Sequence, residues 1–229
     1  MRSRVLSSLT ILGLAVSLAG CGKDSGFGDQ AVADIEAQAA TDMKTLNSVH
    51  IAGTVTTSEG GDAAFDIDAS KGGDCSGTMT IKGGTAQILS VSGTSYLKGD
   101  EAFWTANAGA QAQALIQLLG DKWLKTGGSD SQLAELCDLD KFLDGLDKDQ
   151  GTADAKGETS EINGVDAVEI TSEKDGATAH IWVAVDGKHY IVKLVTEGGD
   201  QPGTLTFSDF DKELHVTAPP ADQVTDLGQ

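Results

Sequence analysis

Short runs of alternating apolar and polar residues, separated by glycine turns, set the strongest limit on how this 229-residue chain can fold. Such runs cover the segments 49–55, 65–69, 79–81 and 86–88, and they return after residue 150. The turns in the second half contain the dipeptides Asn163-Gly164, Asp175-Gly176 and Asp186-Gly187. A period of two indicates strands with one buried face, and Asn-Gly and Asp-Gly are strong hairpin signals. The pattern therefore predicts antiparallel strands joined by short turns.

Helical spacing of apolar residues appears in three other places. These are the segments 32–46, 110–119 and 131–146, while residues 93–104 are expected to close the first set of strands. The order is then helix, strands, helices, strands, which indicates an α+β fold with one continuous antiparallel sheet. No linker divides the chain, so we expect a single domain over residues 29–229.

The strands between residues 177 and 195 have apolar side chains on both faces. Ile181 and Val183 point to one side while Trp182 and Ala184 point to the other, and Tyr190, Val192 and Leu194 are likewise opposed by Ile191 and Val195. A curved sheet, a half-open antiparallel barrel, with helices across its concave face would account for this. The helices either fill the concavity as core or leave an apolar pocket.

The N-terminus has the order of a secretory signal peptide. Arg2 and Arg4 precede an apolar stretch over residues 5–18, and Ala19 and Gly20 precede Cys21. The stretch is too short for a spanning helix. We expect residues 1–20 to be a lipoprotein signal peptide and residues 21–28 to be a lipidated Cys21, carrying acyl chains such as palmitate, followed by a flexible tether. The alternative is a secreted protein in which Cys21 has no special role.

The chain is strongly acidic. Removing residues 1–20 takes away two of the 16 basic residues and none of the 35 acidic ones, so the formal charge changes from −19 to −21. Such a surface repels phosphate backbones, which argues against nucleic acid as a partner. The 39% content of hydrophobic residues in regular patterns argues against disorder.

Two cysteines remain after Cys21. Cys75 and Cys137 form an even pair in a location that is expected to be oxidising, so a disulfide between them is one interpretation and two buried free thiols are the other. A catalytic cysteine is disfavoured because neither Cys75 nor Cys137 has a His beside it in sequence to act as a base.

No motif for catalysis or metal binding stands out. His50, His180 and His189 lie on the polar phase of strands or beside them, and no HExxH, GxSxG, P-loop or GxGxxG motif occurs in a fitting context. A calcium loop over residues 147–158 is disfavoured because Thr152 stands where a Gly is required. We therefore expect no enzyme, no metal and no cofactor.

The order of several short motifs resembles a known family. The lipobox before Cys21 is followed by VHIAGTV, GTSYLKGDEAFW, DKWLKT, NGVDAVEIT, IWVAVDGKHYIVKL and FSDFDKELHVTAPPADQV. Together they resemble the LppX/LprG-type lipoproteins of actinobacteria, with a similar shape in the LolA/LolB lipoprotein carriers and in envelope-stress sensors of the RseB kind. The resemblance covers residues 32–224.

This resemblance implies a half-open barrel whose apolar cavity holds acyl chains of lipids or glycolipids. Strand phase selects the candidates that would line such a cavity, namely Phe65, Ile67, Met79, Ile81, Ile88, Tyr96, Trp104, Leu115, Leu119, Trp123, Ile181 and Val183. The first functional hypothesis is thus a lipoprotein on the extracytoplasmic face of the cell membrane that binds or transfers lipids, with a membrane transporter as a possible partner. The alternative is a sensor or scaffold module that binds an envelope protein.

Overall fold

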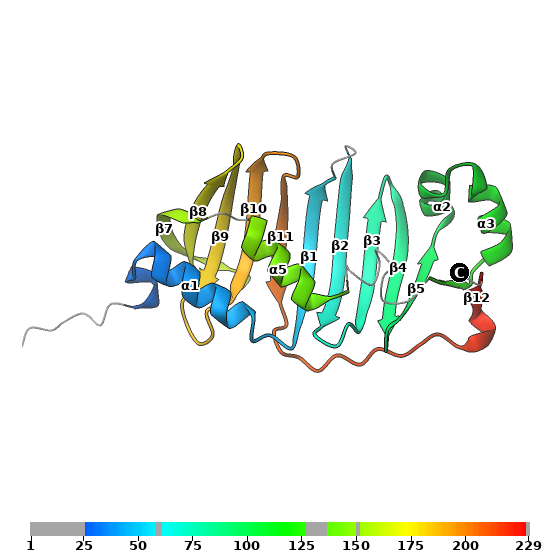
Figure 1. Cartoon of the computed structure of the whole chain (residues 1–229), viewed down its shortest axis with the longest axis horizontal. Helices are drawn as coiled ribbons and strands as arrows, with labels where there is room; N and C mark the ends of the chain where they lie inside the picture. Colours follow the sequence, from blue (N-terminus) through cyan, green and yellow to red (C-terminus); the bar gives the residue numbers. More distant parts are fainter. Residues whose placement is uncertain (1–25, 58–60, 127–136, 150–151, 228–229) are drawn as a thin grey trace, which may run out of the picture.

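The computed structural model describes residues 26–57, 61–126, 137–149 and 152–227, and within 147–149 the backbone only. Twelve strands form one sheet in the order β12-β6-β5-β4-β3-β2-β1-β11-β10-β9-β8-β7 (Figure 1). Their bounds are β1 Ser48–Thr56, β2 Asp62–Ser70, β3 Cys75–Ile81, β4 Gly84–Val91, β5 Thr94–Gly99, β6 Trp123–Lys125, β7 Ala153–Ile162, β8 Val165–Lys174, β9 Ala177–Ala184, β10 Ile191–Gly198, β11 Gly203–Ser208 and β12 Val224–Asp226.

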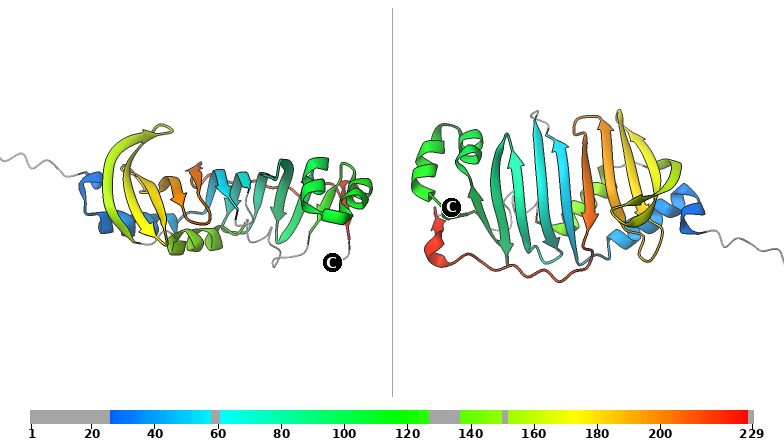
Figure 2. Two further views of the ribbon diagram at one scale, coloured as in Figure 1. Left: turned by 90° about the horizontal axis from the view of Figure 1, so that it is seen from above. Right: turned by 180° about the vertical axis from the view of Figure 1, so that it is seen from behind.

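All neighbouring strands pair antiparallel except β12, which runs parallel to β6. The sheet is open and twisted, and it curves most visibly at β7 and β8 (Figure 2). The predicted α+β fold with one curved, unclosed antiparallel sheet is confirmed. After β11 the chain crosses the ends of the central strands as a segment with no regular structure over residues 212–220, which leads to β12 at the far edge of the sheet (Figure 1).

The described residues contain four α-helices. Their bounds are α1 Val32–Met43, α2 Glu101–Asn107, α3 Ala112–Leu119 and α5 Leu139–Asp149, with short 3-10 turns η1 Phe27–Asp29, η2 Gly109–Gln111 and η3 Ala221–Gln223. Helices α1 and α5 cross one face of the sheet, and α2 and α3 stand at the β5 end (Figure 1). We call the face that carries Ile51, Ile67 and Ile88 the inner face, and the opposite one the outer face.

The main core lies between α1, α5 and the inner face. Ile35, Ala39 and Met43 on α1 are spaced at three and four residues and are all buried, which places one helical stripe against the strands. From the sheet side they meet apolar residues of β8, β9 and β10, and from α5 they meet Leu139 and Leu143. This packing fixes α1 and α5 on the same face.

The hairpin turns form where the glycine dipeptides predict them. Asn163 and Gly164 have φ values of 51° and 84°, and Asp175 and Gly176 have 51° and 81°. Positive φ at both central residues is the geometry of the turn that matches the twist of adjacent strands.

One strand prediction and one helix prediction require correction. The segment 93–104 does not stay extended, because Asp100 caps a helix there and its Oδ1 accepts the Phe103 N–H at 2.6 Å. The helix predicted over 131–146 begins at Leu139, and Cys137 lies in a turn before it. Residues 131–136 of that prediction lie outside the described residues. The helix predicted over 110–119 is α3, preceded by η2.

A β-bulge changes one predicted strand phase. The register of β10 against β9 shifts between Ile191 and Lys193. Ile191 therefore packs with the main core, while Val192 joins a small cluster with Ala167 and Ala184 on the outer face. Strict alternation predicts Val192 and Leu194 on one face of the sheet and Ile191 on the other. This prediction is wrong, because the extra residue of the bulge breaks the period of two.

Candidate functional site

The inner face carries a continuous apolar row across seven strands. Paired positions follow one another from β11 to β6 as Phe207, Ile51, Ile67, Gly77, Ile88, Leu97 and Leu124. Side chains at paired positions of neighbouring strands share a face, so this row is a property of the register. A lone apolar strand could be explained as local core, but a row this long forms an extended surface.

A second row runs beside the first. Its members, in register from β8 to β4, are Ile170, Ile181, Leu194, Leu205, Gly53, Phe65, Met79 and Ala86. At the β8–β10 end these residues lie beneath α1 and α5 and are buried. Toward the middle of the sheet, Phe65 and Met79 are only half-buried. The two helical covers therefore leave the centre of the inner face partly open.

The other end of the inner face is covered by α2 and α3. Phe103, Trp104 and Leu119 are buried against Ala86, with Met79 and Leu97 packed beside them. Glycine permits this close approach, because a Cβ at Gly84 would overlap the backbone of Phe103. The indole N–H of Trp104 donates to the Gly99 carbonyl oxygen at 2.9 Å.

Two apolar cavities lie on the inner face. One has a volume of about 120 Å³ and is lined by Ile51, Val55, Phe65, Ile67, Phe142 and Leu205. The other, about 60 Å³, is lined by Glu36 and Lys44 and otherwise by apolar residues of α1, α5, β8, β9 and β10, namely Ala39, Ala40, Met43, Leu143, Leu146, Ile170, Ile181 and Ile191. Both are smaller than the 300–1,000 Å³ usual for ligand pockets.

A larger concavity, about 680 Å³, is open and polar. It lies between α1 and the turn before Tyr190, and its lining includes Asp34, Gln38, Thr41 and Lys188. An acyl chain gains nothing from a polar lining. This cleft therefore does not serve the apolar ligand that the sequence resemblance implies.

The structure places ten of the twelve predicted lining residues on the inner face or on the helices that cover it. Phe65, Ile67, Met79, Ile81, Ile88, Ile181 and Val183 are on inner-face strands, and Trp104, Leu115 and Leu119 are on α2 and α3. Trp104, Leu119, Ile88 and Val183 are buried, whereas Phe65, Met79, Ile81 and Leu115 are half-buried.

Tyr96 and Trp123 are on the other side. Leu97 pairs with Ile88 and Leu124, so its neighbour Tyr96 points to the outer face, opposite Leu89. Trp123 precedes Leu124 and likewise points outward. The prediction from strand phase is therefore wrong for both residues, because the sequence does not fix the phase of these two short strands.

The sequence prediction missed several residues of this surface, among them Val55, Leu97 and Leu205 on the inner face and Phe142 on α5. The alternation of Leu205 and Phe207 along β11 could have found one of them. The contribution of Phe142 depends on how α5 crosses the sheet, which periodicity does not reveal.

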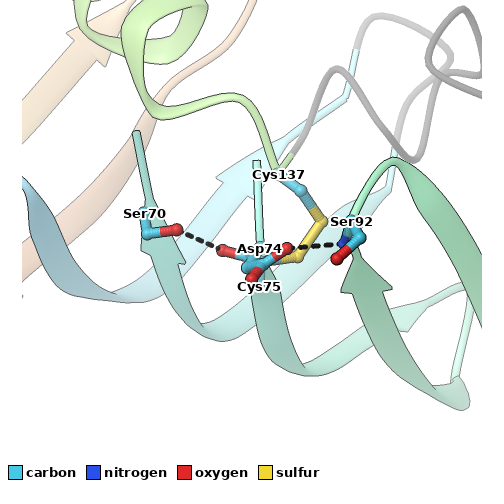
Figure 3. Close-up of a disulfide and its surroundings, with 5 residues drawn as sticks. All are labelled: Ser70, Asp74, Cys75, Ser92 and Cys137. Carbon is cyan, nitrogen blue, oxygen red and sulfur yellow. Dashed lines mark hydrogen bonds between the residues drawn. A yellow bond between two sulfur atoms is a disulfide. The ribbon is translucent and has the colours of Figure 1, made fainter. Parts of the chain in front are cut away.

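A disulfide joins Cys75 to Cys137, with their Cα atoms 5.4 Å apart (Figure 3). Both residues are fully buried, and they pack with Ile67, Ala69 and Ile88. Next to the bond, the Asp74 carboxylate accepts the Ser92 N–H at 2.8 Å, and the Asp74 carbonyl oxygen accepts the Ser70 hydroxyl at 3.0 Å (Figure 3). The predicted disulfide is thus present, and it ties the start of β3 to the segment that leads into α5.

The histidines have carboxylate or backbone partners. His50 Nδ1 lies 2.9 Å from Asp68 Oδ1, and His180 Nδ1 lies 2.7 Å from Glu169 Oε1, both pairs on neighbouring strands. His189 Nδ1 is 2.9 Å from the Ala184 carbonyl oxygen. Within the described residues, no group of three or more His, Cys, Asp or Glu side chains is placed to hold a metal ion.

One hydrogen-bonded tyrosine fixes the turn after β11. The Tyr190 hydroxyl donates to Asp211 Oδ2 at 2.8 Å, and the Asn47 backbone and side-chain N–H groups donate to Asp211 Oδ1. Burial raises the pKa of Tyr190, and its bond to Asp211 adds to that shift. Desolvation opposes ionisation of Asp211, but the hydrogen bonds from Asn47 and Tyr190 outweigh it and lower the pKa of the carboxyl.

In the part of the chain with described structure, no helix is both long and apolar enough to span a membrane.

Comparison with solved structures identifies the fold. LprF from Mycobacterium bovis superposes with a TM-score of 0.61 at 15% sequence identity, over 82% of this chain and 96% of that one. The lipoprotein LppX from Mycobacterium tuberculosis superposes with a TM-score of 0.52 at 18% identity, over 81% of this chain and 98% of that one. This chain has the LprF/LppX fold.

The resemblance drawn from the short motifs is therefore confirmed for the fold. A LolA superfamily protein from Nitrosomonas europaea is also similar, at 11% identity over 81% of this chain and 96% of that one, but its TM-score of 0.30 is too low to carry any argument. No protein-family profile and no curated protein sequence matches the chain.

Proposed function

We propose that this protein is a lipoprotein, anchored through Cys21 to the extracytoplasmic face of the cell membrane, that binds or transfers lipids or glycolipids on its inner face. It works without covalent chemistry: acyl chains gain burial against the sheet, and a membrane or a membrane transporter supplies and receives the lipid. Each methylene removed from water contributes about 0.8 kcal/mol, so apolar contact alone can hold a long chain.

The observation that carries this proposal is the second apolar row of the inner face, which runs from Ile170 on β8 to Ala86 on β4 and is only half-buried at its centre, at Phe65 and Met79. A sheet that served only as core would be covered there by helices, as it is at both ends. The LprF/LppX fold supports the proposal because solved proteins with this fold include a lipoprotein. The lipobox-like sequence before Cys21 supports the anchor.

The experiment uses adjacent residues on β3 that point to opposite faces. Met79 is half-buried on the inner face, and Thr78 is exposed on the outer face. In the full chain with Cys21→Ser, we expect native mass spectrometry to detect bound monopalmitoylglycerol. Met79→Glu should reduce the bound fraction by tenfold or more, about 1.4 kcal/mol, because it places a carboxylate against the acyl chain.

Thr78→Glu is the matched control, since it adds the same charge to the same strand and leaves the inner face unchanged. Equal loss of binding in both variants would contradict the proposal, because the effect would then come from charge rather than from the inner face. Absence of bound lipid in the parent protein would contradict it directly.

The small volumes of the two apolar cavities favour a second candidate function, a sensor or scaffold that binds an envelope protein. On that hypothesis the inner face is core, and the acidic surface makes the contact. A stoichiometric partner that is lost when exposed acidic residues are neutralised, together with no lipid in native mass spectra, would favour it.

A further inference from the structure

Helix α5 separates the two apolar cavities. Phe142 lines the larger cavity, beside β1, β2 and β11, while Leu143 and Leu146 line the smaller one, beside α1 and β8–β10. These residues are consecutive on the apolar stripe of α5, so the two spaces lie on either side of the same helix. Figure 1 shows α5 crossing the sheet in front of β10, β11 and β1.

Neither cavity holds a long acyl chain as it stands, because each has room for only a few atoms. The space beneath α5 is occupied by four side chains of the helix, namely Leu139, Phe142, Leu143 and Leu146. Moving this helix away from the sheet would join the two cavities into one passage bounded by inner-face residues.

Helix α5 has little stability of its own without packing against the sheet. It is 11 residues long and contains Gly145, and a helix of this length is marginal without packing. A Cβ at Gly145 would meet no atom within 4 Å, so one side of the helix is open. Its N-terminus is capped by Asp138, whose Oδ1 accepts the Lys141 N–H at 3.1 Å.

Two attachments hold the ends of α5. Before the helix, the disulfide fixes Cys137 to Cys75 on β3. After it, the Ala153 N–H donates to Glu36 Oε1 on α1 at 3.1 Å. Between these points α5 is held mainly by its apolar stripe, because the pair of Lys71 and Asp140, at 3.8 Å, is exposed and therefore weak.

Resting on the proposed function, we infer that α5 is a displaceable cover: a single linear acyl chain enters beneath it, replaces its side-chain contacts with the sheet and joins the two cavities, while the disulfide keeps the start of the helix in place. The apolar stripe of α5, which packs on the sheet when no lipid is bound, then packs on the bound acyl chain. Displacement costs little net burial, because the acyl chain restores the apolar contacts that the helix gives up.

Distance measurement between spin labels tests this directly. In the full chain with Cys21→Ser, labels at Asp144→Cys on α5 and Thr54→Cys on the outer face of β1 report the height of the helix over the sheet. Both positions are exposed, so the labels replace no core contact. A control pair at Gln38→Cys on α1 and Thr54→Cys reports a helix that should stay in place.

On addition of monopalmitoylglycerol, we expect the distance to Asp144 to lengthen by several ångströms and the distance to Gln38 to stay unchanged. Native mass spectrometry of the same labelled samples reports whether lipid is bound. Bound lipid with no change in either distance, or with equal changes in both, would overturn the role of α5 and leave the proposed function standing. No bound lipid would overturn the proposed function, and this inference with it.

Discussion

At the scale of single residues, the pair of Tyr190 and Asp211 connects the start of β10 to the turn after β11. The hydrogen bonds lower the pKa of Asp211 below its ordinary value of 3.8, so the folded protein binds a proton there less readily than the unfolded chain does. This contribution to stability is fully present above pH 4, and it is lost as the pH falls through the lowered pKa.

We predict that Tyr190→Phe lowers the free energy of unfolding by about 1 kcal/mol, less than is usual for a bond to a charged group, because Asp211 is exposed. Urea unfolding at pH 7 and at pH 3 measures it, and the difference from the parent should shrink at pH 3. Tyr96→Phe, on the outer face, is the matched control. A difference that grows toward acid pH would contradict this assignment.

At the scale of elements, the hairpins can be predicted from local chemistry, whereas the helices can be predicted only in part. Asn163-Gly164 and Asp175-Gly176 form their turns because both dipeptides tolerate positive φ. Helix α2 differs from the extended segment predicted over residues 93–104, because Asp100 caps a helix directly after β5. The parallel pairing of β12 with β6 was not predicted, since three residues carry no usable period.

The apolar surface of the candidate site could be predicted where strands are long and regular, as for Phe65, Ile67 and Met79. It could not be predicted for Tyr96 and Trp123, because phase is fixed by pairing with neighbours and one residue of error changes the face. The cavities at Phe142 and Leu146 depend on the tertiary position of α5.

The disulfide attaches the start of α5 to the sheet, because it joins Cys137 to Cys75 at the start of β3. We predict that Cys75→Ala with Cys137→Ala lowers the free energy of unfolding by about 2–4 kcal/mol, because the bond closes a loop with a sequence separation of 62 residues. Urea unfolding followed by tryptophan fluorescence measures it. Cys21→Ser is the control, and a loss in the double variant no larger than in this control would contradict the prediction.

At the scale of the whole molecule, two parts of the chain have separate tasks in our proposal. Cys21 attaches the protein to the membrane, and the sheet with its helices holds lipid. We predict that Cys21→Ser abolishes metabolic labelling with palmitate and moves the protein from the membrane to the soluble fraction. The double variant Cys75→Ala with Cys137→Ala should stay labelled, and equal labelling of the Cys21→Ser protein would contradict the anchor.

The central claim is that lipid lies on the inner face, and photo-crosslinking tests it most directly. A monoacylglycerol with a diazirine on its acyl chain is bound to the full chain with Cys21→Ser, irradiated, and the adducts are mapped by mass spectrometry. We predict adducts on inner-face residues such as Phe65, Met79 and Ile181. Adducts confined to outer-face residues such as Tyr96 and Trp182, or none at all, would contradict it.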